Sequence, residues 1–126
     1  MSIRLDHIIV PAKDKQVSAE FLARILGLEV GPRTGPFLPV RTANGVTLDF
    51  MDSPDFRRQH CAFLVPEEEF DGILARIKES GAPFYAHPDG SGPGEINTRD
   101  GGRGVYFTDP SGHAMEVLTV PYGGWS

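Results

Sequence analysis

Hydrophobic and polar residues follow two different periods along the chain. Two segments repeat apolar residues every three to four positions, which predicts a helix capped by Asp14 and running to about Leu26, and a second helix from Pro66 to Gly81. Shorter segments bounded by turn residues predict strands. The predicted strands cover residues 5–10, 29–31, 37–42, 46–51, 60–65, 83–86, 104–108 and 114–120.

This order of elements occurs twice. The sequence Leu22-Ala23-Arg24-Ile25 recurs as Leu74-Ala75-Arg76-Ile77, an offset of 52 positions, and His7 and His60 are offset by 53. A near-constant offset across a strand and a helix predicts two similar modules in tandem, about 1–55 and 56–126, in a single domain of 126 residues. The predicted fold class is therefore α+β, with the order βαβββ–βαβββ.

Polar residues interrupt four of the predicted strands. Side chains alternate between the two faces of a strand, so when the aliphatic face is assigned to the helices, His7, Asp49, His60 and Glu116 all fall on the opposite face. Two imidazoles and one carboxylate can bind a divalent metal and leave positions open for substrate, which makes His7, His60 and Glu116 candidate metal ligands. Such a set suits Fe(II) and also admits Mn, Co, Ni or Zn. For either histidine taken alone, a core side chain bonded to the backbone is the alternative.

A long segment rich in Gly, Pro and Asp lies between His87 and Arg103. Loops of this length in a compact domain commonly cover a site. Arg103 and Asn97, together with Arg99, are candidates to bind an anionic substrate from this loop, and solvated surface residues are the alternative. In the tail, Tyr122 and Trp125 are expected either to cover an apolar surface or to contact a second subunit.

Composition narrows the range of partners. The net charge is −5 and the longest basic run is Arg57-Arg58, which argues against nucleic acid as a partner. The single cysteine, Cys61, excludes an internal disulfide framework and fits a reducing cytoplasm. Apolar segments stay far below membrane-spanning length, so we expect no membrane partner.

Three motifs resemble the vicinal oxygen chelate superfamily, which contains glyoxalase I, fosfomycin-resistance thiol transferases, extradiol dioxygenases and bleomycin-resistance proteins. They are the opening Leu5-Asp6-His7-Ile8, the central His60-Cys61-Ala62, and the closing Tyr106-Phe107-Thr108-Asp109-Pro110-Ser111-Gly112-His113-Ala114-Met115-Glu116-Val117. The resemblance covers essentially the whole chain. It implies a curled mixed sheet that encloses a cleft, with the helices outside, and a homodimer.

The resemblance also implies roles for individual residues. His7, His60 and Glu116 match the positions of the family's metal ligands, and Asp49 stands where the glyoxalases usually have Glu. Asp49 would then act as a general base beside the metal, and Tyr106 would hydrogen-bond substrate.

Two functions follow as expectations. The first is a metalloenzyme in which a divalent metal chelates and activates a small oxygen-rich substrate, with dioxygenase, lyase or thiol-transferase chemistry. The alternative is a non-catalytic protein that sequesters an antibiotic or another small molecule, because the same fold serves many functions.

Overall fold

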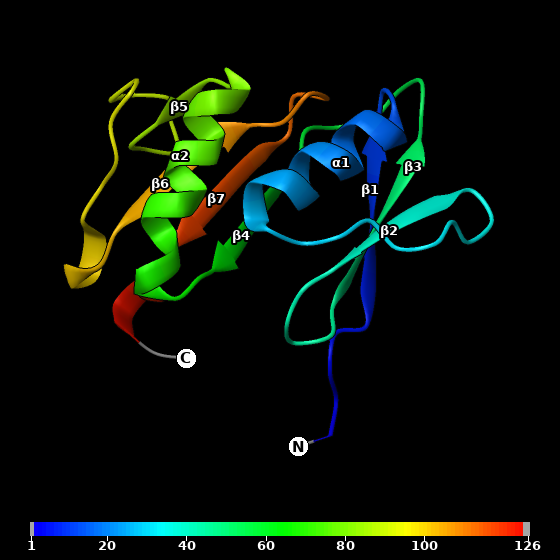
Figure 1. Ribbon diagram of the computed structural model, residues 1–126, viewed down its shortest axis with the longest axis horizontal. Helices are drawn as coiled ribbons and strands as arrows, with labels where there is room; N and C mark the ends of the chain where they lie inside the picture. The colour runs from blue at the N-terminus through cyan, green and yellow to red at the C-terminus, as the bar shows by residue number, and fades with distance from the viewer. Residues whose placement is uncertain (1, 125–126) are drawn as a thin grey trace. The chain divides into compact units, whose positions relative to one another are not determined.

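The computed structural model describes residues 2–124, which divide into two compact units, Met1–Arg57 and Arg58–Ser126. In this described part of the chain, each unit packs an α-helix on a mixed β-sheet (Figure 1). The predicted α+β class is confirmed. Hydrogen bonding groups the strands of residues 2–124 into two sheets, one in each unit, where the sequence analysis expected a single curled sheet.

The first unit contains β1 (His7–Ala12), α1 (Lys15–Leu26), β2 (Phe37–Arg41) and β3 (Thr47–Asp52). Its sheet has the order β1-β3-β2, with β1 parallel and β2 antiparallel to β3. The helix begins where the Asp14 carboxylate accepts hydrogen bonds from the first free backbone N–H groups, and it ends at Gly27, whose φ of 71° suits glycine. Leu22 and Ile25 of α1 are fully buried, as is Phe50 of β3.

The second unit contains β4 (His60–Leu64), α2 (Phe70–Ser80), β5 (Phe84–Tyr85), β6 (Gly104–Thr108) and β7 (Ala114–Leu118), in the sheet order β4-β7-β6-β5. The helix buries Phe70, Ile73 and Ile77, which are spaced three to four residues apart, and Figure 1 shows it in front of β6 and β7. Single turns of 3-10 helix occur at η1 (Glu67–Glu69), η2 (Arg99–Gly101) and η3 (Tyr122–Gly124).

None of the helices formed by residues 2–124 combines the length and apolar character needed to cross a bilayer.

Three predicted elements differ from the observed ones. The strand expected at 29–31 makes only a single bridge, between Val30 and Val40, because Gly31 is followed by Pro32, which has no N–H to donate. The helix expected from Pro66 starts as the 3-10 turn η1 and becomes α-helical at Phe70. The strand expected at 83–86 pairs only at Phe84 and Tyr85.

The sequence Asp109-Pro110-Ser111-Gly112 forms the turn between β6 and β7. The Gly112 N–H donates to the Asp109 carbonyl at 2.9 Å, which closes the turn. The buried Asp109 carboxylate accepts from the backbone N–H groups of Ser111 and His113. This turn sets the register of β7, and with it the position of Glu116.

Candidate functional site

Strand register brings the polar residues of the second unit together. Glu116 lies at the centre of β7, directly opposite Tyr106 on β6 and Ala62 on β4. His60 precedes Ala62 by two residues and therefore shares its face of β4. The sheet thus places His60 and Glu116 on one face, as the alternation of the sequence predicts, and adds Tyr106 to that face.

His60 and Glu116 are in direct contact. The His60 Nε2 atom lies 2.8 Å from Glu116 Oε1. Glu116 is 1% exposed, whereas the His60 side chain is 47% exposed. A buried carboxylate is costly unless it is paired, and the imidazole supplies the partner from the solvent side. The ring of Tyr106 meets the His60 ring edge-on, with the ring centroids 5.7 Å apart.

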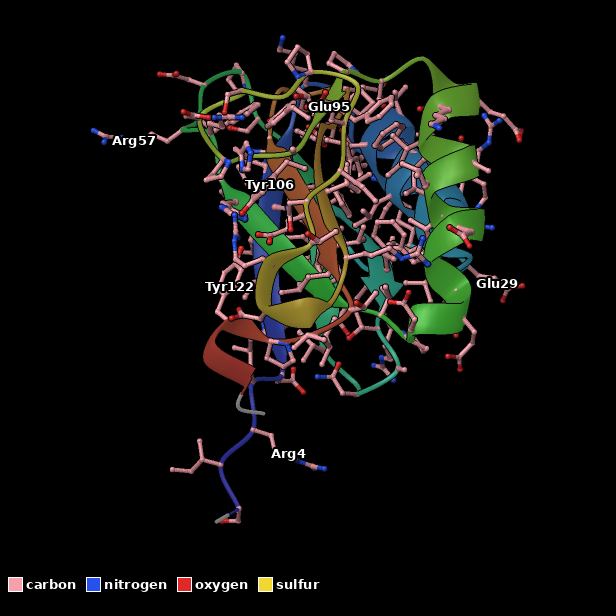
Figure 2. All side chains as sticks on the ribbon, turned by 90° about the vertical axis from the view of Figure 1, so that its left-hand side faces the viewer. Arg4, Glu29, Arg57, Glu95, Tyr106 and Tyr122 are labelled. Atoms are coloured by element: carbon pink, nitrogen blue, oxygen red, sulfur yellow. The ribbon has the colours of Figure 1, made fainter. Side chains whose placement is uncertain are left out.

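Tyr122 was expected to cover an apolar surface or contact a second subunit, and the structure instead brings its hydroxyl to the polar site; Trp125 lies outside the residues that the structure describes. The Tyr122 hydroxyl donates a hydrogen bond to Glu116 Oε2 and lies 2.8 Å from the Tyr106 hydroxyl. Partial burial and the hydrogen bonds to Glu116 and Tyr106 raise the pKa of the Tyr122 phenol above its ordinary value, so the phenol remains a proton donor. Figure 2 shows Tyr106 and Tyr122 on the side of the sheet away from α2.

These residues line an open pocket of about 490 Å³. Its lining consists of His60, Pro88, Arg99, Asp100, Tyr106 and Tyr122. The Arg99 guanidinium donates to the Tyr106 hydroxyl at 3.3 Å and lies 5.1 Å from the centre of the Tyr122 ring. The long loop therefore contributes a cation to the pocket through Arg99.

The other two loop candidates make different contacts. Arg103 pairs with Glu67 and Asp71, at 2.7 and 2.6 Å, and its guanidinium lies over the Phe70 ring. Asn97 donates to the Ala86 carbonyl at 2.7 Å and accepts from the Arg99 backbone N–H. Neither belongs to the lining of the pocket that contains His60, and substrate binding by Arg103 and Asn97 stays a prediction.

The first unit has a pocket of its own, of about 450 Å³, whose lining includes His7 and Asp49. His7 is exposed, and its Nδ1 lies 2.7 Å from Asp6 Oδ2. The hydrogen bond to Asp6, with further contributions from the charges of Asp6 and Asp49, raises the pKa of the His7 imidazole. Arg41 contributes a cation to the same pocket.

The two sheets place His7 and His60 at equivalent register positions. On β1, Ile9 follows His7 by two residues and lies opposite Asp49 of the parallel strand β3. On β4, Ala62 follows His60 by two residues and lies opposite Glu116 of the parallel strand β7. Asp49 is thus the counterpart of Glu116 in the internal repeat, one methylene shorter.

The predicted metal ligands come from both units: His7 from the first, His60 and Glu116 from the second. Within residues 2–124, no three His, Cys, Asp or Glu side chains are arranged to hold a metal ion. The imidazole nitrogen and carboxylate oxygen that meet at 2.8 Å are nevertheless donors that divalent transition metals accept. The chemistry of this donor pair suits a divalent metal, for which His60 Nε2 and Glu116 Oε1 would be the binding atoms.

Comparisons with known proteins identify the family. Residues 4–117 match the Glyoxalase/Bleomycin resistance protein/Dioxygenase superfamily, and the chain belongs to this superfamily. The resemblance found in the sequence is thereby confirmed. Glutathione transferase FosA of Serratia marcescens is 26% identical over 120 residues, which are 90% of this chain and 78% of that protein. Metallothiol transferase FosB of Shouchella clausii is 31% identical over 102 residues, or 73% of this chain and 61% of that protein.

Solved structures of similar proteins extend this result. Oxidase ChaP-H2 has a TM-score of 0.96 and 56% sequence identity, covering 98% of both chains. The fosfomycin resistance protein FosX of Listeria monocytogenes has a TM-score of 0.73 and 25% identity, covering 96% of this chain and 94% of that one. The chain is therefore similar over its length to an oxidase and, more distantly, to fosfomycin-resistance proteins.

Proposed function

We propose that this protein is a divalent-metal-dependent oxidase that acts on a small oxygen-rich molecule. The observation that carries the proposal is the pairing of the buried Glu116 carboxylate with His60 beside an open pocket. The 56% identity to an oxidase over 98% of the chain favours oxidation over lyase or thiol-transferase chemistry.

The proposed metal ligands are His7, His60 and Glu116. His60 and Glu116 already meet through their donor atoms, and His7 occupies the equivalent position in the internal repeat. When bound, a divalent metal would act as a Lewis acid toward adjacent oxygens of a substrate. Elemental analysis would show whether this metal is Fe, Mn, Co, Ni or Zn.

The remaining polar residues of the two pockets have roles in substrate handling. Tyr106 and Arg99 present a hydroxyl and a cation to the pocket that contains His60, and both suit an oxygen-rich and partly anionic molecule. Asp49, next to His7 in the lining of the first pocket, is the proposed general base.

A second candidate function is sequestration of a small molecule or antibiotic without catalysis. The family includes bleomycin-resistance proteins, and both pockets are large enough to hold small molecules. The buried His60–Glu116 pair favours the enzyme, because a binding cavity needs no imidazole–carboxylate pair at its base.

We further propose that the protein works as a cytoplasmic homodimer. A single cysteine suits a reducing compartment. β1 and β4 are edge strands that expose Ile9 and Leu64, and exposed apolar edge strands favour pairing with a second chain.

The metal is tested by elemental analysis of protein purified without a tag or chelator. We expect about one divalent metal per chain and its loss in His60→Ala, since the pair then loses its nitrogen donor. His87→Ala is the matched control, because His87 is an exposed loop histidine whose backbone bonds to Ser91 and Gly90 do not depend on the side chain.

Oxygen uptake then distinguishes oxidation from lyase and thiol-transferase chemistry. The metal-loaded protein is given catechols, vicinal diols and hydroxyketones, which offer two adjacent oxygens, and consumption of dioxygen is followed with an electrode. Uptake that disappears in His60→Ala supports the oxidase. A metal-loaded protein that consumes no dioxygen with any of these compounds contradicts the oxidase, and failure to bind any of the five metals contradicts the metalloenzyme itself.

A further inference from the structure

The carboxylate of Glu116 has a different partner on each oxygen. Oε1 faces His60 Nε2 at 2.8 Å, and Oε2 accepts the hydroxyl proton of Tyr122. With Oε2 engaged by Tyr122, the carboxylate plane is fixed and Oε1 is the oxygen directed at the imidazole. Carboxylates that bind metals are commonly held in this way by a hydrogen bond to the second oxygen.

The hydrogen bonds behind Glu116 run in one direction. Because the Tyr122 hydroxyl gives its proton to Glu116, the Tyr106 hydroxyl must donate to Tyr122 across their 2.8 Å separation. The Tyr106 oxygen in turn accepts from the Arg99 guanidinium at 3.3 Å. A chain of donors thus leads from the cation of the long loop to the buried carboxylate.

Contacts with the loop hold the segment that carries Tyr122, residues 121–124, which we call the C-terminal strap. The Gly123 N–H donates to the Asp100 carboxylate at 3.2 Å, and the Arg99 guanidinium lies over the Tyr122 ring. Asp100 has a φ of 55°, a left-handed conformation that is uncommon for residues other than glycine. Both loop residues also line the pocket, so the strap and the pocket wall share the same side chains.

We propose that Tyr122 is a positioning residue, which holds Glu116 in the orientation that binds metal and thereby couples closure of the C-terminal strap to the metal site. This role rests on the proposed function. It differs from simple packing because the effect passes through a single hydroxyl group on one carboxylate oxygen.

The test removes only that hydroxyl. Tyr122→Phe keeps the ring under Arg99 and loses the hydrogen bond to Glu116. Affinity for Zn²⁺ is measured by competition with a chromophoric chelator, and amide hydrogen exchange of the C-terminal peptide is measured by mass spectrometry in the metal-free protein. We expect Zn²⁺ affinity to fall about 10- to 100-fold. We also expect faster amide exchange in the strap, because the hydrogen bond that ties it to Glu116 is lost.

Tyr85→Phe is the matched control. Tyr85 stacks on Tyr106 in the same unit, and its hydroxyl accepts from Arg58 at 3.2 Å, away from Glu116 and Tyr122. This variant loses the same chemical group and should retain wild-type Zn²⁺ affinity. An equal loss of affinity in both variants would indicate a general packing effect and overturn the positioning role.

The outcomes separate this role from the proposed function. If the wild-type protein binds Zn²⁺ and the Tyr122→Phe variant binds it with equal or higher affinity, the positioning role is wrong. The proposed metalloenzyme function is then unaffected. Wild-type protein that binds no Zn²⁺ and no other divalent metal overturns both.

Discussion

Glu116 is the buried carboxylate that binds two of the side chains lining the second unit's pocket, His60 and Tyr122. A carboxylate that is 1% exposed needs compensation for the water it has lost, and here each oxygen has its own hydrogen-bond partner. His60, its partner on the pocket side, is nearly half exposed, so that side of the pair can be reached from solvent. Removal of either partner should therefore disturb the site and also lower the free energy of unfolding, because one carboxylate oxygen loses its hydrogen bond.

Two glycines offer opposite tests of packing in the same unit. A Cβ at Gly102 would lie 2.7 Å from Thr119 Oγ1 and 2.7 Å from Val120 Cγ2, directly before the strap, so Gly102→Ala should lower the free energy of unfolding by about 1–3 kcal/mol. A Cβ at Gly72, exposed within α2, meets only the end of the flexible Arg76 side chain. Gly72→Ala should therefore raise stability by about 0.5–1 kcal/mol.

Urea denaturation of the two variants measures both effects. Equal stabilities for the two variants would contradict the close packing of the loop against residues 119 and 120. A Gly102→Ala variant with the wild-type urea midpoint would also contradict this close packing.

At this scale, alternation along strands predicts which face a residue occupies but not which atoms meet. His60 and Glu116 could be assigned to one face because each lies in a strand whose aliphatic face is clear, whereas the face of Tyr106 follows from its register opposite Glu116. Tyr122 could not, because it follows β7 in a glycine-rich segment without a period. Its contact with Glu116 depends on how that segment folds back along the loop.

Helix α1 shows the clearest agreement between sequence and structure at the level of elements. Asp14 caps it and Leu26 ends it as expected, because capping is a local interaction that the sequence specifies directly. The segment at 29–31 shows the opposite case, since only one residue pair forms a bridge there. The strand propensity of a segment does not ensure that it pairs with a neighbouring strand when a proline, here Pro32, has no backbone N–H to donate.

The cap of α1 can be tested by a single substitution. Asp14→Ala removes the acceptor for the N–H groups of Gln16 and Val17, at 3.0 and 3.3 Å, and should lower the free energy of unfolding by about 1 kcal/mol. Asp14→Ser keeps an acceptor at the same position and should stay close to the wild type. Equal losses in the two variants, measured by urea denaturation, would assign the effect to something other than the cap.

The internal repeat shows how far the whole molecule could be anticipated. The matched offsets of the histidines and of the helix sequence predict two modules, and residues 2–124 form a helix-on-sheet arrangement in each unit. The place of Asp49 came from the family resemblance and not from the offset, because its separation from Glu116 along the chain differs from that of the histidines; strand register gives the equivalence directly. Loop lengths between strands vary between modules, which obscures such pairs in a sequence.

The proposed homodimer gives the last prediction. Leu64, 58% exposed on the edge strand β4, is an apolar side chain that a subunit interface would cover, so Leu64→Glu should shift the molecular mass in solution from dimer to monomer. Val17, 48% exposed on α1, is the matched control, and Val17→Glu should leave the dimer intact because Val17 lies on a helix and not on an edge strand. Sedimentation velocity at several concentrations measures both. A monomeric wild-type protein contradicts the homodimer itself, and a Leu64→Glu variant that remains dimeric places the interface away from β4.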